Sequence, residues 1–298
     1  MHALLEHEAT KVGYIGARSG RFWHLAGAGA GREAVTLGDN PDGHLFAPVS
    51  ILVSEGARQD GADFLRSVRH KKEFDFVAHV GGDSIPMIIQ GARHFHAIND
   101  AWLRDWMTDV PGTMCWFTRH QGWRYQQVRL DVAPKPTTGI DPVINLHESY
   151  LMSVVALDPL MSHLPEPQVW TNAAGLGEGV VRARNAADQP AWPRYTMNGP
   201  GRWWIGDLGG GDEPRIVQTP PILAGETLRI DTHPRHRTAR VYSNANPSGR
   251  NVWGALAGRG WFASVPAWDS VAVPVRITEG NTESTIRVDV SPRSSRPY

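Results

Sequence analysis

Short segments in which apolar and polar residues alternate constrain the fold of this chain most strongly. Residues 227–231 read TLRID, residues 273–278 read VPVRIT and residues 286–290 read IRVDV, so that every second side chain is apolar. Successive side chains of a β-strand point to opposite faces, and this spacing therefore predicts half-buried strands. The connecting stretches, such as LGGGDEP, NANPSGRN and TEGNTES, are rich in turn-forming residues. Short strands joined in this way indicate a sandwich or jelly roll in the C-terminal half.

The N-terminal half also reads as mainly β. Residues 12–29 predict a hairpin that turns at Ser19-Gly20, and residues 112–134 predict a second one that turns at Gln121-Gly122. Further strands are expected in EAVTLGD, HLFAPVSILVSEGA and YLMSVVALDPL. In EFDFVAH the side chains of Phe74, Phe76 and Ala78 fall on one face. This regular alternation predicts that they point into a core.

One helix is expected, over residues 85–107. Asp83 or Ser84 could cap its N-terminus, and Pro86 stands at a first-turn position that tolerates proline. Bulky side chains recur three or four residues apart at Phe95, Ile98, Trp102 and Trp106. This spacing places them on one side of the helix, which we expect to pack against a sheet.

The length of 298 residues favours two domains over a single core. The polar, proline-containing stretch SHLPEPQ suggests a boundary near residue 165, which gives a first domain over residues 1–165 and a second over residues 166–298. The last residues, SPRSSRPY, have the composition of a frayed tail.

Composition argues against several classes of partner. Lys+Arg and Asp+Glu both number 30, so no net charge attracts the chain to nucleic acid or to an anionic membrane. No segment reaches the roughly 18 apolar residues of a membrane helix. The single cysteine, Cys115, excludes an internal disulfide and suits folding in a reducing cytoplasm. The start, MHALLEHEATK, has acidic residues inside its only apolar turn, unlike a secretory signal.

No constellation in the sequence requires catalysis, a metal or a cofactor. The glycine-rich residues 26–33 lack the spacing of a nucleotide-binding loop, and no G-x-S-x-G elbow occurs. His94 and His96 would point in different directions on a helix. His233 and His236, with Asp231 nearby, form a weak candidate for a zinc site, for which a solvated turn is the more favoured interpretation. Cys115 lies in a strand-like run, where a buried and inert thiol is expected.

Tryptophan is concentrated in the β-rich half. Trp192 and Trp253 are expected in the core of a sandwich. Trp203 and Trp204 are adjacent, so in a strand they face opposite sides, and one of them should point outward. An outward tryptophan can stack on a sugar or anchor a protein interface, and we therefore take Trp203 and Trp204 as candidate contact residues.

The segment NAADQPAWPRYTMNGPG, residues 185–201, resembles the N-x-x-D-x-P-A-W-P-x-x-T-x-x-G-P-G pattern of distal tail proteins of long-tailed bacteriophages. These are often described as minor tail proteins in phages of Actinobacteria. The likeness extends over nearly the whole chain through GREAVTL, FAPVSILVSEGARQDGA, INDAWLRDWM, ILAGETLRIDT and NVWGALAGRGWFASVPAW. The order and spacing of these fragments, more than any one of them, make the resemblance specific.

The resemblance implies a mainly β chain with one packed helix, in which a belt-type β domain is followed by a galectin-like β-sandwich. It implies a homo-hexameric ring at the virion tail tip that joins the tail tube to the baseplate hub and receptor-binding proteins. The tail tube protein, the tail hub protein and the tape measure protein would be its partners, after synthesis in the host cytoplasm. The family brings no catalytic residue, metal or cofactor. The alternative is a carbohydrate-binding protein that recognises host cell-wall glycan through its C-terminal sandwich.

Residues 189–193 form a corner that proline makes rigid. Pro190 and Pro193 each lack an N–H and force the preceding residue into an extended conformation. We expect these two prolines to stiffen the entry to the C-terminal β-sandwich. We expect the Trp192 side chain to enter the core of that sandwich and so to hold the corner in place.

Overall fold

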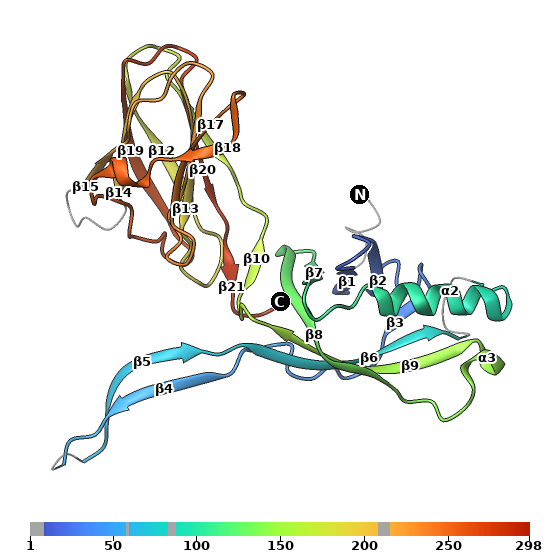
Figure 1. Cartoon of the computed structure of the whole chain (residues 1–298). Helices are drawn as coiled ribbons and strands as arrows, with labels where there is room; N and C mark the ends of the chain where they lie inside the picture. Colours follow the sequence, from blue (N-terminus) through green and yellow to red (C-terminus); the bar gives the residue numbers. More distant parts are fainter. Residues whose placement is uncertain (1–8, 58–59, 83–87, 208–214) are drawn as a thin grey trace. The chain divides into compact units, whose positions relative to one another are not determined.

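The computed structural model describes residues 9–57, 60–82, 88–207 and 215–298. The chain divides into two compact units, one of Met1–Ser162 with Ser294–Tyr298 and the other of His163–Arg293. Strands dominate both units (Figure 1), which confirms the predicted mainly β fold class. Neither α-helix in the described ranges is long and apolar enough to cross a lipid bilayer.

The first unit is built on one large sheet whose main path has the strand order β2-β1-β7-β8-β9-β6-β3. These strands are β1 (Lys11–Ile15), β2 (Phe22–Ala26), β3 (Val35–Leu37), β6 (Lys72–Gly81), β7 (Gly112–Thr118), β8 (Gly122–Pro136) and β9 (His147–Ala156). Both predicted hairpins are present, as β1–β2 and β7–β8. Phe74, Phe76 and Ala78 are buried, as their alternation in β6 predicts. Strands β2 and β3, at the two ends of the order, come into contact, so the sheet nearly closes on itself.

The expected helix is present but shorter than the sequence indicates. It is α2 (Gly91–Arg104), and it buries Phe95, Ile98 and Trp102, three members of the predicted apolar side. Its N-cap is Gln90, whose side chain makes no capping hydrogen bond; the predicted cap at Asp83 or Ser84 and the proline at position 86 lie outside the described residues. A second, single-turn helix, α3 (Pro142–Asn145), was not predicted; it begins where the Asp141 side chain accepts a hydrogen bond from the Val143 N–H.

A buried carboxylate just after α2 fixes this helix to the β1–β2 hairpin. The Asp105 carboxylate accepts hydrogen bonds from the Trp23 indole N–H at 2.8 Å and from the Ser19 hydroxyl and N–H at 2.7 and 2.9 Å. Its backbone oxygen accepts from the Tyr14 hydroxyl at 2.7 Å. The Tyr14 ring stacks on Trp106, with ring centroids 3.8 Å apart. Polar and aromatic contacts thus both hold the end of α2 against the β1–β2 hairpin.

Two further strands of the first unit form a separate two-stranded sheet, the β4–β5 hairpin. Strand β4 (Val49–Ser54) pairs antiparallel with β5 (Asp63–Arg69), and neither pairs with the large sheet. The register shifts between Leu52 and Val53, which marks an irregularity of the bulge type. Figure 1 shows the two strands as a long ribbon.

The second unit is a β-sandwich of two sheets. The six-stranded sheet has the order β11-β20-β13-β16-β17-β18 and the four-stranded sheet the order β12-β19-β14-β15. Their bounds are β11 (Gln168–Thr171), β12 (Glu178–Arg184), β13 (Pro193–Asn198), β14 (Arg202–Asp207), β15 (Arg215–Gln218), β16 (Thr227–Asp231), β17 (Thr238–Ser243), β18 (Asn246–Asn251), β19 (Ser270–Thr278) and β20 (Thr285–Val290). A 3₁₀ turn, η1 (Trp253–Leu256), follows β18. The inward residues of both sheets form one apolar core.

The chain crosses between the units at residues 162–163 and returns at residues 293–294. Short strands lie at these crossings, β10 (Met161–His163) and β21 (Arg293–Ser294). The C-terminal residues are therefore not the frayed tail that their composition suggests. Ser294 is buried, and the Arg124 guanidinium donates a hydrogen bond of 2.7 Å to the Arg296 carbonyl. The last five residues of the chain thus belong to the first unit.

Candidate assembly surfaces

The β4–β5 hairpin exposes apolar side chains on both of its faces. All six residues of β4 are exposed, and so are six of the seven residues of β5. Ile51 of β4 is 64% exposed, and Phe64 and Leu65 of β5 are 65% and 62% exposed. Consecutive side chains of a strand point to opposite faces, so Phe64 and Leu65 lie on different sides of the ribbon. Neither apolar core of the described chain includes them.

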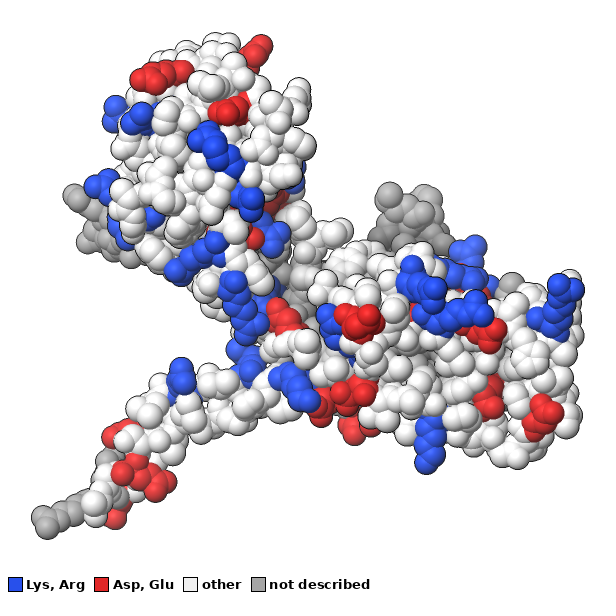
Figure 2. Space-filling view, in the orientation of Figure 1, with Lys and Arg blue, Asp and Glu red and all other residues white. Residues whose placement is uncertain are grey.

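A hairpin of this kind has little stability of its own in water. A two-stranded ribbon without a covered face is at best marginally stable in isolation. Large exposed apolar patches usually mark a surface that another molecule covers. Figure 2 shows the hairpin as mostly uncharged, with acidic side chains toward its tip, where Glu55, Asp60 and Asp63 stand in the sequence. The hairpin is thus an apolar arm with acidic residues near its tip.

The sequence missed this surface, although the residues carried a signal. The run Ile51–Val53 is apolar without alternation, a pattern usually given by strands that are buried on both faces. The prediction of a strand there was correct. All six residues of this strand are nevertheless exposed.

The paired tryptophans of β14 face opposite sides, as predicted, but only one can meet a partner. Trp203 is fully buried in the sandwich core, and its ring meets Trp170 edge-on at 6.0 Å between centroids. Its proposed role as a contact residue is therefore wrong, because the inward side of β14 is covered by the opposite sheet. Trp204 is half-buried on the outer face, with the Arg276 guanidinium 5.3 Å from its ring centroid.

The proline corner is ordered, but its tryptophan does not enter the core. Ala191 and Pro193 are buried, whereas Trp192 is half-buried and lies edge-on to His233, with centroids 5.0 Å apart. Side chains alternate here as in a strand, and the small Ala191 takes the inward position. The expectation that Trp192 holds the corner in the core is thus corrected.

The buried Asn185 holds the corner instead, a role that no pattern in the sequence indicates. Its side-chain amide donates hydrogen bonds to the carbonyls of Gln189, Val265 and Pro266, at 2.8, 3.3 and 2.9 Å. Its carboxamide oxygen accepts from the Ala187 N–H at 3.2 Å. One buried side chain thus ties residues 185–189 to the loop that contains residues 265–266. Asparagine suits this place because its amide both donates and accepts.

The candidate histidine pair lies beside an ion pair, and Cys115 is buried. No group of three or more His, Cys, Asp and Glu side chains with metal-binding geometry occurs in the described ranges. The Asp231 carboxylate forms an ion pair with Arg194 at 3.0 Å and accepts a hydrogen bond from the His233 N–H. Cys115 is fully buried, and burial raises the pKa of its thiol to about 12.

Lys72, which is not among the predicted site residues, is a buried basic residue in the first unit. It is completely buried, and its ammonium nitrogen has no hydrogen-bond partner among the described residues. Burial lowers its pKa to about 8. It shares a face of β6 with Phe74 and Phe76, which line an apolar pocket of about 160 Å³ together with His44 and Tyr298. Extending the alternation of Phe74 and Phe76 back by one step would have identified it.

Comparison with known proteins gives one similar sequence and several similar structures. The chain is 23% identical, over 320 residues, to the minor tail protein Gp27 of Mycobacterium phage L5. The aligned region covers 90% of this chain and 92% of that protein. No model of a protein family matches the chain.

Among solved structures, the chain is similar to the SPP1 Dit (gp 19.1) protein, with a TM-score of 0.60 and 13% identity. The match covers 96% of this chain and 99% of the Dit chain, which is described as a paradigm of the hub adsorption apparatus in phages that infect Gram-positive bacteria. A chain of the phage P2 baseplate, in its activated conformation with calcium, gives a TM-score of 0.57 at 7% identity and covers 95% of this chain.

Proposed function

Since this chain is a phage distal or minor tail protein, we propose that it is a structural, non-catalytic component of the tail tip that assembles as a hexameric ring. The observation that supports the ring is the β4–β5 hairpin, an arm whose two faces are apolar and exposed. Such an arm is incomplete in a monomer. In a tail built from repeated subunits, a second copy of the chain would cover the exposed faces of the arm.

The ring that we propose would use two different surfaces of each copy. A two-fold dimer joins a surface to the same surface of its partner, whereas a ring joins two different surfaces head to tail. The arm would extend onto the next copy, and its own unit would receive the arm of the previous copy. Because both faces of the arm are apolar, one face would pack on the neighbouring copy and the other on a further protein of the tail. This geometry closes when the rotation between copies is one sixth of a turn.

The ring would join the tail tube to the baseplate hub and the receptor-binding proteins. We propose the tail tube protein, the tail hub protein and the tape measure protein as its neighbours, in a virion whose parts are made in the host cytoplasm. The zero net charge of the chain suits association through apolar surfaces.

Sedimentation velocity of two matched double variants tests the role of the arm. The first, Ile51→Ser with Phe64→Ser, removes apolar side chains that are 64% and 65% exposed on the hairpin. The control, Leu176→Ser with Val180→Ser, removes side chains that are 79% and 58% exposed on the second unit. We expect the hairpin variant to stay monomeric at concentrations at which the wild type and the control assemble. Equal assembly of all three proteins would contradict the proposal.

A further inference from the structure

A polar pocket in the second unit brings together two arginines from distant parts of the sequence. It has a volume of about 480 Å³ and is lined by Arg202 of β14, Gln218 at the end of β15, residues 219–221, residues 255–257 and Arg259. This volume lies within the usual range of small-molecule sites. Every residue of this lining belongs to the second unit, so the pocket does not depend on how the two units are arranged.

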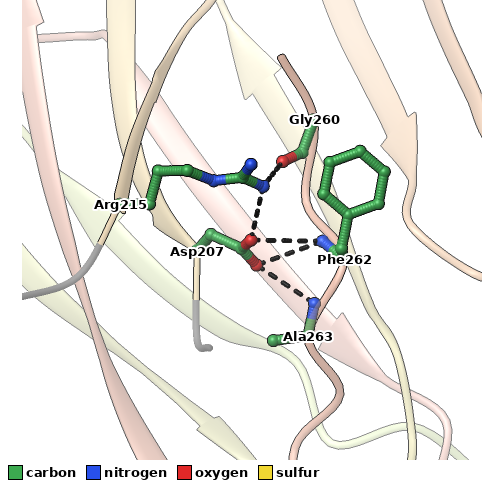
Figure 3. A network of polar contacts seen from close by, with 5 residues as sticks. All are labelled: Asp207, Arg215, Gly260, Phe262 and Ala263. Carbon is green, nitrogen blue, oxygen red and sulfur yellow. Dashed lines mark hydrogen bonds and ion pairs between the residues drawn. The ribbon is translucent and has the colours of Figure 1, made fainter. Parts of the chain in front are cut away.

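The loop that presents Arg259 is fixed by a buried carboxylate (Figure 3). Asp207, at the end of β14, accepts hydrogen bonds of 3.2 Å from the backbone N–H groups of Phe262 and Ala263. It also forms an ion pair of 2.7 Å with Arg215, whose guanidinium in turn donates to the Gly260 carbonyl. One carboxylate–guanidinium pair thus anchors the segment after Arg259 at three backbone groups, in Gly260, Phe262 and Ala263.

The other side of the loop is set by η1. Ala257, which follows the last residue of this turn as its C-cap, adopts a left-handed conformation with φ of 50°. Non-glycine residues in that conformation cost free energy and persist only where the surroundings impose them. The Arg259 N–H donates to the Leu256 carbonyl at 2.9 Å, which closes the loop directly after the turn. Arg259 therefore stands on a backbone that is held at both ends.

The pocket carries an uncompensated positive charge. Both arginines line it, and no Asp or Glu does. Within the described ranges neither guanidinium forms an ion pair, and the buried Nε of Arg202 has no hydrogen-bond partner. A buried N–H without an acceptor is unfavourable, and a guanidinium forms its strongest hydrogen bonds with oxyanions. An anionic ligand would supply a partner for the two guanidinium groups that line the pocket.

We propose that this pocket binds a phosphate group carried by a sugar. Two guanidinium groups match the charge and the multiple acceptors of a phosphate. The pocket is much larger than a phosphate ion, and the Gln218 side chain and the proline-rich residues 219–221 supply polar and apolar walls for the group that carries it. Trp204 lies on the same outer face of β14 as Arg202 and pairs with Gln218 in register. Its indole gives a stacking surface beside the pocket.

Isothermal titration of the full chain with three probes tests the ligand class. Glucose 1-phosphate carries both groups, inorganic phosphate carries the anion alone and glucose carries the sugar alone. We expect glucose 1-phosphate to bind about tenfold more tightly than inorganic phosphate, and glucose not to bind detectably. Absence of binding by glucose 1-phosphate, or equal affinity for it and for inorganic phosphate, would overturn the proposal.

Variants locate the site. Arg202→Gln and Arg259→Gln should each weaken glucose 1-phosphate binding about tenfold, the size expected for the loss of a charge-assisted hydrogen bond. Arg182→Gln is the control, because Arg182 is exposed on β12 of the same sheet and does not line the pocket. Arg202→Lys keeps the charge without the fork of donors and should give an intermediate affinity. Unchanged melting curves would establish that the variants are folded, and unchanged affinity in both glutamine variants would refute the assignment.

Discussion

Replacing Lys72 with methionine should stabilise the first unit at neutral pH. Lys72 is completely buried, and its ammonium group has no hydrogen-bond partner in the described residues. The reduction of its pKa from the ordinary 10.5 to about 8 corresponds to about 3 kcal/mol of unfavourable free energy for the charged form. Methionine keeps the long unbranched stem and removes the charge. We therefore expect Lys72→Met to raise the free energy of unfolding by about 1–3 kcal/mol at pH 7.

The stability gained by Lys72→Met should depend on pH. Lys72 has a lower pKa in the folded than in the unfolded chain, so the unfolded chain binds more protons between about pH 8 and 10.5. Stability rises with pH in such an interval, because the folded protein has lost its buried charge. The advantage of Lys72→Met over wild type should therefore be largest below pH 8 and shrink as pH rises. Buried tyrosines such as Tyr14, whose pKa is raised by burial, titrate in both proteins and cancel in the comparison.

Differential scanning calorimetry at pH 7 and pH 9.5 measures the effect. A gain of 1 kcal/mol raises the melting temperature of a domain of this size by roughly 2–4 °C. Lys71→Met is the matched control, because Lys71 is 56% exposed and pairs with Glu73 at the surface. It should change the melting temperature little at either pH. A lower melting temperature for Lys72→Met, or an equal gain at both pH values, would refute the reasoning.

Three further predictions follow from buried groups. Asp105→Ala leaves the Trp23 indole N–H without its acceptor and should destabilise the first unit by about 2–4 kcal/mol in urea denaturation; a loss below 1 kcal/mol would contradict this. Trp203→Ala should cost about 3–5 kcal/mol by the same assay and Trp204→Ala less than half as much, so equal losses would be inconsistent with their burial. Cys115 should resist maleimide labelling at pH 8 until the protein unfolds, and rapid labelling of the folded chain would show that its thiol is accessible.

Local patterns predicted the strands well because burial in a sheet leaves a period of two in the sequence. β6 shows this directly, since Phe74, Phe76 and Ala78 alternate with exposed or half-buried side chains. The helix was placed correctly by its bulky side chains, but its start was not, because Gln90 caps it without a side-chain hydrogen bond. At the corner, the prediction from residue type was wrong. The large apolar Trp192 was expected to be buried, but the small Ala191 points inward and Trp192 is only half-buried.

Contacts between residues far apart in sequence could not be predicted in this way. Trp23 and Asp105 are 82 positions apart, and no local pattern indicates that their side chains meet. The same holds for Arg202 and Arg259, which share a pocket only because β14 and the loop after η1 come together in the sandwich. The return of residues 294–298 to the first unit likewise depends on tertiary packing. In β4, finally, an apolar run predicts burial, whereas all six residues of the strand are exposed.

The central claim is that the exposed arm joins identical copies into a closed ring. The most direct test is the mass of the full chain by native mass spectrometry, over a range of concentrations from dilute to high micromolar. The account predicts a species of six copies of the 32.8 kDa chain that grows at the expense of the monomer, without a series of larger species. A monomer at every concentration, or a dimer that does not grow further, would contradict it.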